Sequence, residues 1–221
     1  MITSQHLLEG SIYALKQCGH LLQSAITLFK DGDYSAAIAV ATFGNEELGR
    51  SRILRRLWHE VVQGSKTLTI EDLKNYLQDH VKKLEVAQTG VAIRASLDQG
   101  LGQQLRTLLH SRPDSEKYQE AEKIVNDASQ RKKNRTPDDR HRMRLRSLYV
   151  DPNDSGTSWN KPWEISCDEA KVFLEDVLND YGMELDPFNH LDILDLKYPE
   201  FAKAYRSWTD RPNLLPRPAL V

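Results

Sequence analysis

Apolar residues recur at helical spacing along most of the chain. Between Ser4 and Lys30 they follow one another in alternating steps of four and three, which places them on one helix face. A second apolar line runs from Tyr34 to Val62, and the short Asp-Gly-Asp segment between the two is typical of a tight turn. The pattern therefore predicts two long helices that pack as an antiparallel hairpin.

Later segments continue the helical pattern. Thr69 and Asp72 resemble a capping box, which would begin a continuous third helix over about 70–93. Further helices are predicted at 101–130 (with a break near Pro113), 138–150, 167–182 and 198–208. A Pro-rich stretch at 211–221 predicts an irregular tail. No strand alternation occurs, so the predicted fold class is all-α, an antiparallel helical bundle.

Turn residues after residue 150 suggest a division of the chain. We expect residues 1–155 to form the bundle, and residues 156–221 to form an additional acidic helical segment with the Pro-rich tail. The formal net charge of −2 conceals a strong asymmetry. Residues 131–146 carry eight Lys or Arg against two Asp, whereas residues 151–200 carry thirteen Asp or Glu against three Lys. This predicts either an anionic partner for the basic block or mutual shielding of the two segments.

Composition and motifs limit the cellular location and the kinds of activity that we expect. The two cysteines, Cys18 and Cys167, show no metal or redox spacing, which favours a cytoplasmic protein. No apolar run approaches the roughly 20 residues of a membrane span, so no membrane partner is expected. The first residues lack a secretion-signal pattern. No Gly-rich phosphate loop is present, which argues against nucleotide hydrolysis.

Charged residues interrupt the apolar line of the second helix. Extending that line through its gap places Glu47 and Arg50 on the core-facing side, with Glu46 one turn before Arg50. A buried charge is costly unless it is paired. These residues therefore predict either a polar cleft or, if the helix is rotated, an ordinary surface salt bridge.

Two later helices show the same feature. His80 occupies a core-facing place in the third helix, where a satisfied core histidine is the alternative. Arg142, Arg146 and Tyr149 share one face of the 138–150 helix. Facing side chains build sites inside helical bundles, so we expect one shared site from these three helices.

The chemistry of this set suits metal-independent RNA cleavage. His80 can move a proton, Arg50 and Arg142 can bind the phosphate, Glu47 can orient a partner, and Tyr149 can donate a hydrogen bond or stack on a base. A metal site is the rival, but a di-iron bundle needs Glu-x-x-His motifs, and none occurs. We therefore expect neither a metal nor a cofactor.

Three short motifs carry a family resemblance. They are "NEELGR" at 45–50, "DHVKKL" with His80 and Lys83, and "RLRSLYVDP" at 144–152. In these motifs, over about residues 5–155, the chain resembles the AbiV type of the HEPN superfamily. The resemblance implies a HEPN bundle, a homodimer, abortive-infection defence against phage, RNase or toxin activity, and a possible phage-encoded activator. The family usually has Lys where this chain has Arg50, which preserves the charge but would not replace a proton donor.

HEPN RNases often carry an Arg followed by His after four to six residues. Arg135 and His141 fit with five residues between them, and Arg52 and His59 fit with six. The first pair is better placed, inside the basic block and before the last core helix. We expect RNA contacts from Glu46, Lys83, Lys132, Lys133, Arg144 and Arg146. Sequence leaves open whether His80 or His141 is the key base.

Two functions remain open at this point. One is an antiphage endoribonuclease that blocks translation or growth. The other is a non-catalytic helical protein that binds a phage product, RNA or a ribosomal partner, with the Glu–Arg–His set as a structural network.

Overall fold

The computed structural model of the chain describes residues 1–88, 115–133, 136–152 and 156–185, together with positions 107, 112 and 218. For residues 125–133 and 183 it describes the backbone only. The predicted helix at 198–208 and the Pro-rich tail apart from residue 218 lie outside this part. Residues 89–93 of the predicted third helix and residues 101–114 of the next, apart from 107 and 112, also lie outside it.

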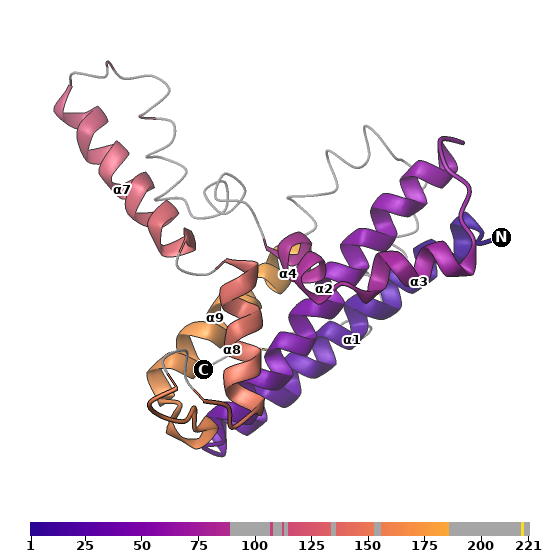
Figure 1. Ribbon diagram of the computed structural model, residues 1–221. Helices are drawn as coiled ribbons and strands as arrows, with labels where there is room; N and C mark the ends of the chain where they lie inside the picture. Colours follow the sequence, from indigo (N-terminus) through magenta and orange to yellow (C-terminus); the bar gives the residue numbers. More distant parts are fainter. Residues whose placement is uncertain are drawn as a thin grey trace.

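Two long antiparallel helices, α1 (Ser4–Lys30) and α2 (Tyr34–Val62), form the body of the bundle (Figure 1). The Thr3 side chain caps α1 by accepting from the His6 amide, and the Asp33 side chain caps α2 by accepting from the Ala36 amide. Gly32 has a φ of 84°, which allows the tight turn between them. The predicted helical hairpin is confirmed.

The predicted continuous third helix is wrong, because it divides at Asp79. Helix α3 (Ile70–Gln78) begins with the expected capping box, and α4 (His80–Ala87) follows. Asp79 between them has an extended ψ of 110°, and its side chain accepts from the amide of Lys82. Asp79 therefore caps α4, which makes His80 the first residue of a separate short helix.

The remaining described elements are α7 (Glu116–Lys133), α8 (Pro137–Leu148), the short 3₁₀ helix η1 (Pro162–Glu164) and α9 (Cys167–Leu185). Figure 1 shows α8 and α9 side by side along one flank of the α1–α2 hairpin, with α7 lying to one side. The described residues contain no strand, only an isolated bridge between Pro152 and Trp159. The all-α fold class is confirmed.

The hydrophobic core extends into the segment beyond residue 155. Ala170, Leu174, Val177 and Tyr181 of α9 are buried in the same cluster as the facing residues of α1 and α2. Helix α9 is therefore packed into the bundle, and its apolar stripe contributes to folding stability.

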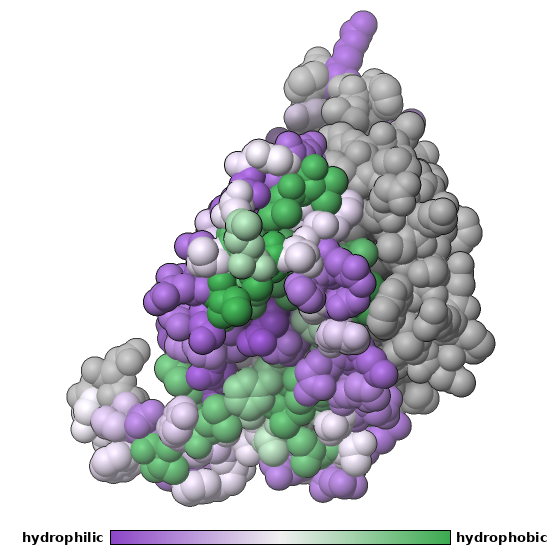
Figure 2. Space-filling model, turned by 90° about the vertical axis from the view of Figure 1, so that its right-hand side faces the viewer, coloured by the Kyte–Doolittle hydropathy of each residue, from purple (hydrophilic) through white to green (hydrophobic). Residues whose placement is uncertain are grey.

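The outer surface mixes polar and apolar side chains. On the face shown in Figure 2, apolar groups lie between hydrophilic ones. Single exposed apolar residues are normal for a folded domain, so exposure alone does not mark a site. None of the helices that the structure describes is both long and apolar enough to cross a membrane.

Candidate functional site

Glu46 is the centre of a polar cluster at the junction of α2, α4 and α8. This residue is only 5% exposed. Oε2 accepts from Nδ1 of His80 at 2.7 Å, and Oε1 accepts from the Arg144 guanidinium at 2.8 Å. Nζ of Lys83 lies 3.5 Å from Oε2. Three helices thus bring one carboxylate, one histidine and two cations together.

A glycine permits this close arrangement. A Cβ built at Gly49 of α2 would lie 1.9 Å from the carbonyl oxygen of Lys83. Only a residue without a side chain lets the α4 backbone approach α2 this closely. Gly49 therefore sets the distance at which α4 presents His80 and Lys83 to Glu46.

His80 lies at the rim of the cluster. Its side chain is 49% exposed, so the expectation that it faces the core is wrong. The break at Asp79 ends the helical line on which that expectation rested. An ionised carboxylate can only accept, so Nδ1 of His80 carries the proton of the 2.7 Å bond. Nε2 makes no hydrogen bond to any residue that the structure describes, which leaves it available to a ligand.

Glu46 rather than Glu47 points inward. The apolar line drawn through Phe43, Glu47 and Arg50 misjudged the rotation of α2, because Phe43 is exposed while Asn45 and Glu46 are buried. Glu47 and Arg50 lie partly exposed beside the cluster, with Oε1 and Nε 3.3 Å apart. Burial raises the pKa of Glu47 above its usual 4.5, although the nearby Arg50 guanidinium acts in the opposite direction.

Arg144, rather than Arg142, belongs to the cluster. The Arg142 side chain is 71% exposed and binds Asp139 on its own helix at 2.7 Å, so its predicted inward orientation is wrong. Arg146 binds Glu169 of α9 at 2.7 Å. Residues two positions apart on a helix face nearly opposite directions, which is why one arginine points inward and its neighbours do not.

The other predicted residues lie outside this cluster or outside the described side chains. Tyr149 is the half-exposed C-terminal cap of α8. His141 is partly buried, and its Nδ1 has no hydrogen-bond partner among the described residues. The structure does not describe Arg135 or the side chains of Lys132 and Lys133. The predicted pairing of Arg135 with His141 therefore stays a prediction.

Sequence reasoning missed a second buried polar group, centred on Arg140. Its guanidinium donates to Oδ1 of Asn45 at 2.7 Å, to Asp176 at 2.6 Å and to Asp180 at 2.8 Å. Asn45 precedes Glu46 on α2, and Arg140 lies one turn before Arg144 on α8. The group therefore fixes α8 and α9 against α2 beside the Glu46 cluster.

Helix α9 extends this pairing by one further turn. Glu184 follows Asp176 and Asp180 at steps of four and binds both Arg52 and Arg55 of α2. Arg52 also donates to the backbone carbonyls at 86 and 87, at the end of α4. The regular acidic spacing was a usable sequence signal for this contact. The ion pairs of Arg140 and Arg146 with α9 provide the predicted shielding between the acidic segment and part of the basic block.

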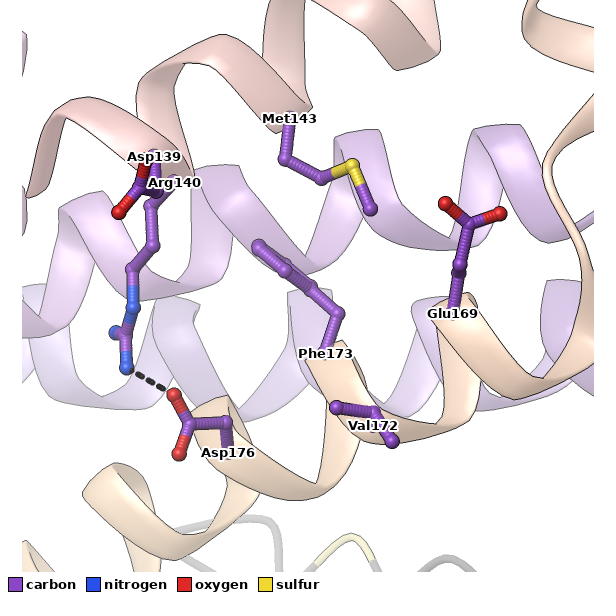
Figure 3. A pocket seen from close by; sticks show the side chains of 7 residues that line it. All are labelled: Asp139, Arg140, Met143, Glu169, Val172, Phe173 and Asp176. Carbon is purple, nitrogen blue, oxygen red and sulfur yellow. Dashed lines mark hydrogen bonds and ion pairs between the residues drawn. The ribbon is translucent and has the colours of Figure 1, made fainter. Parts of the chain in front are cut away.

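A small pocket of about 290 Å³ lies between α8 and α9. Met143, Val172 and Phe173 form its apolar wall, with the Arg140–Asp176 charged pair at one end and Glu169 at the other (Figure 3). That charged pair is already hydrogen-bonded internally, as the dashed line shows. The charged pair in the pocket therefore already has its partners within the protein, whereas Nε2 of the half-exposed His80 has none among the described residues.

The arrangement around Glu46 suits proton transfer next to an anion. A carboxylate bonded to one ring nitrogen fixes the histidine tautomer and stabilises the protonated ring. Arg144 and Lys83 supply positive charge at the same place. Among the described residues, no three His, Cys, Asp or Glu side chains are grouped so that they could hold a metal ion.

Comparison with known proteins identifies the family of this chain. No curated protein and no solved structure matches the chain significantly. The HEPN family model described as AbiV matches residues 6–181, which is most of the chain and reaches through the acidic residues at 176 and 180. This family suggests a role in abortive-infection defence. The chain belongs to the AbiV family of HEPN proteins.

Proposed function

We propose that this protein is a metal-independent endoribonuclease of abortive-infection defence, with His80 as its proton-transfer residue. The observation that carries the proposal is the 2.7 Å bond between buried Glu46 and half-exposed His80, with Arg144 on the same carboxylate. This is a histidine with one nitrogen held by the protein and the other without a hydrogen bond to any described residue.

The proposed reaction is attack of the RNA 2′-oxygen on the adjacent phosphorus. Neutral His80 accepts the 2′-hydroxyl proton at Nε2 while the new P–O bond forms. The P–O5′ bond breaks, and the 5′-oxygen takes a proton from the imidazolium or from water. The products are a 2′,3′-cyclic phosphate and a 5′-hydroxyl. DNA lacks the 2′-hydroxyl and should be spared.

The charged neighbours have distinct parts in this proposal. Glu46 holds the ring orientation and stabilises the imidazolium. Arg144 and the partly exposed Arg50 stabilise the negative charge that develops on the phosphate oxygens. The buried Nε–H of Arg144 has no hydrogen-bond partner in the described structure. A buried unsatisfied donor in a site is one that a ligand oxygen can satisfy.

The family resemblance adds context to the proposal. It implies a cytoplasmic homodimer whose RNA cleavage blocks translation or growth once a phage-encoded activator is present. The partly exposed Arg50 beside the cluster would help to attract RNA to the site, because phosphate contacts supply most non-specific affinity.

The test is cleavage of RNA by purified protein with EDTA present. His80→Ala should lower the cleavage rate about 10²- to 10⁴-fold, which is typical for loss of a general base or acid. Arg142→Ala should cleave as wild type does, because Arg142 points away from the cluster. His141→Ala decides whether the second candidate histidine takes part. Equal cleavage by wild type and His80→Ala would remove His80 from the mechanism.

A non-catalytic role is the second candidate, because Glu46 already has three partners within the protein. Because His80 is half exposed and its partner Glu46 is buried, His80→Ala should cost about 1–3 kcal/mol of unfolding free energy in either role. The proposed enzyme predicts lost cleavage and lost toxicity in protein that is still folded, whereas a purely structural network predicts that wild type cleaves no RNA and that His80→Ala loses stability alone. Urea unfolding measured beside cleavage separates the two roles.

A further inference from the structure

Phe43 is an exposed aromatic residue one turn before Glu46 on α2. Its side chain keeps 38% of its surface exposed, although the apolar pattern predicts it in the core. The buried face of α2 next to it is made of small residues, including Ala41, Thr42 and Gly44. Helix rotation therefore turns the Phe43 ring out of the core.

The ring is directly connected to the candidate site. Cζ of Arg144 lies 5.7 Å from the ring centroid of Phe43. That distance is close to the outer limit of about 6 Å for a cation–π contact, and 38% of Phe43 stays exposed beside the guanidinium. Arg144 binds Glu46, and Glu46 binds His80. Phe43, Arg144 and His80 thus belong to one continuous set of contacts.

We propose that Phe43 stacks on an unpaired RNA base beside the scissile phosphate, which makes single-stranded RNA the substrate of this site. The inference rests on the proposed function and adds the substrate class. Every base has a flat face that stacks on an aromatic ring, and the phosphate of the same nucleotide suits an arginine beside that ring. In a duplex the bases are stacked on one another, so a single ring reaches only unpaired ones.

Position in the site, rather than exposure, distinguishes Phe43. Trp159 and Trp163 are more exposed, at 61% and 70%, but neither makes a hydrogen bond or ring contact with the described residues of the Glu46 cluster. Trp163 lies in η1, outside the junction of α2, α4 and α8. It therefore serves as a matched control for a general loss of exposed aromatic surface.

The experiment measures binding separately from cleavage. The probe is a short single-stranded RNA with 2-aminopurine as reporter base and 2′-O-methyl groups throughout, which cannot be cleaved. Phe43→Leu should weaken its binding about five- to 150-fold, the loss expected when one stacked base is released. It should also abolish the fluorescence quenching that stacking causes. Phe43→Trp should restore both, and Trp163→Leu should bind as wild type does.

A duplex of the same sequence should bind with little dependence on residue 43. Equal binding of the single strand by wild type and Phe43→Leu would overturn the inference, and so would an equal loss from Trp163→Leu. If wild type cleaves RNA but Phe43→Leu binds normally, the proposed function stands and the stacking role fails. If the probe binds through Phe43 but no RNA is cleaved, the stacking role stands and the ribonuclease function fails.

Discussion

The contact between Gly49 and α4 gives a direct test of how the site is held together. In Gly49→Ala the new Cβ would lie 1.9 Å from the carbonyl oxygen and 2.6 Å from the carbonyl carbon of Lys83, whereas ordinary contacts begin at 3.4 Å. The clash is with backbone, so rotating a side chain cannot relieve it. Helix α4 must retreat by about 1.5 Å, the difference between 3.4 Å and 1.9 Å.

The retreat should break the key hydrogen bond. His80 begins the same short helix, so the 2.7 Å distance between its Nδ1 and Oε2 of Glu46 would lengthen to as much as about 4.2 Å. A misplacement of about 1 Å can cost about 10²-fold in rate, and we expect that loss in RNA cleavage. Overpacking should cost about 1–3 kcal/mol of unfolding free energy, partly offset by up to about 1 kcal/mol from the better helix propensity of alanine.

A second glycine provides the matched control. A Cβ at Gly182 of α9 would lie more than 4 Å from every described side chain other than those of its two neighbours in the chain, and from the described backbone of every other element. Gly182→Ala should therefore keep full cleavage and gain up to about 1 kcal/mol of unfolding free energy. Urea unfolding and cleavage rates of both variants check the argument. Wild-type stability together with wild-type cleavage in Gly49→Ala would show that α4 does not need this approach to α2.

Two further predictions concern charges around the site. Arg140→Met leaves Asp176 and Asp180 buried without their arginine, so it should lower the unfolding free energy by about 3–5 kcal/mol in urea unfolding. The exposed Arg142→Met should change it by no more than about 0.5 kcal/mol. Equal effects of the two substitutions would contradict the assigned burial. Because folding raises the pKa of Glu47 above 4.5, its ionisation makes the folded state less stable as the pH rises through that range. The unfolding free energy of Glu47→Gln minus that of wild type should therefore increase as the pH rises from about 4 to about 7. A difference that stays constant or shrinks over this range would refute the predicted sign.

The helices and their ends were determined by local sequence. The Asp-Gly-Asp turn, the Thr69 capping box and the alternating apolar spacing act within a few residues of one another, so they could be recognised without a fold. Asp79 is the exception, because its capping of α4 interrupts a pattern that looked continuous. Sequence therefore predicted the helical hairpin correctly and the third helix incorrectly.

The candidate site was predictable as a set of segments but not as a set of side chains. The segments with Glu46, His80 and Arg144 were all identified from polar residues on apolar lines and from the family motifs. Which residue in each points inward depends on the rotation of its helix, where a shift of one position turns a side chain by about 100°. Because the actual rotations differ from the predicted ones, Glu46 lies in the cluster instead of Glu47, and Arg144 instead of Arg142.

The sequence alone determined an all-α chain, most of its helix caps and the short motifs that carry the family resemblance. Only the tertiary structure decided that Gly49 admits α4, that α9 neutralises Arg140, and that Phe43 faces outward. These features depend on contacts between residues far apart in the chain. Helix propensity and periodicity act within one helix, whereas the distance and rotation between helices are fixed by packing the whole core.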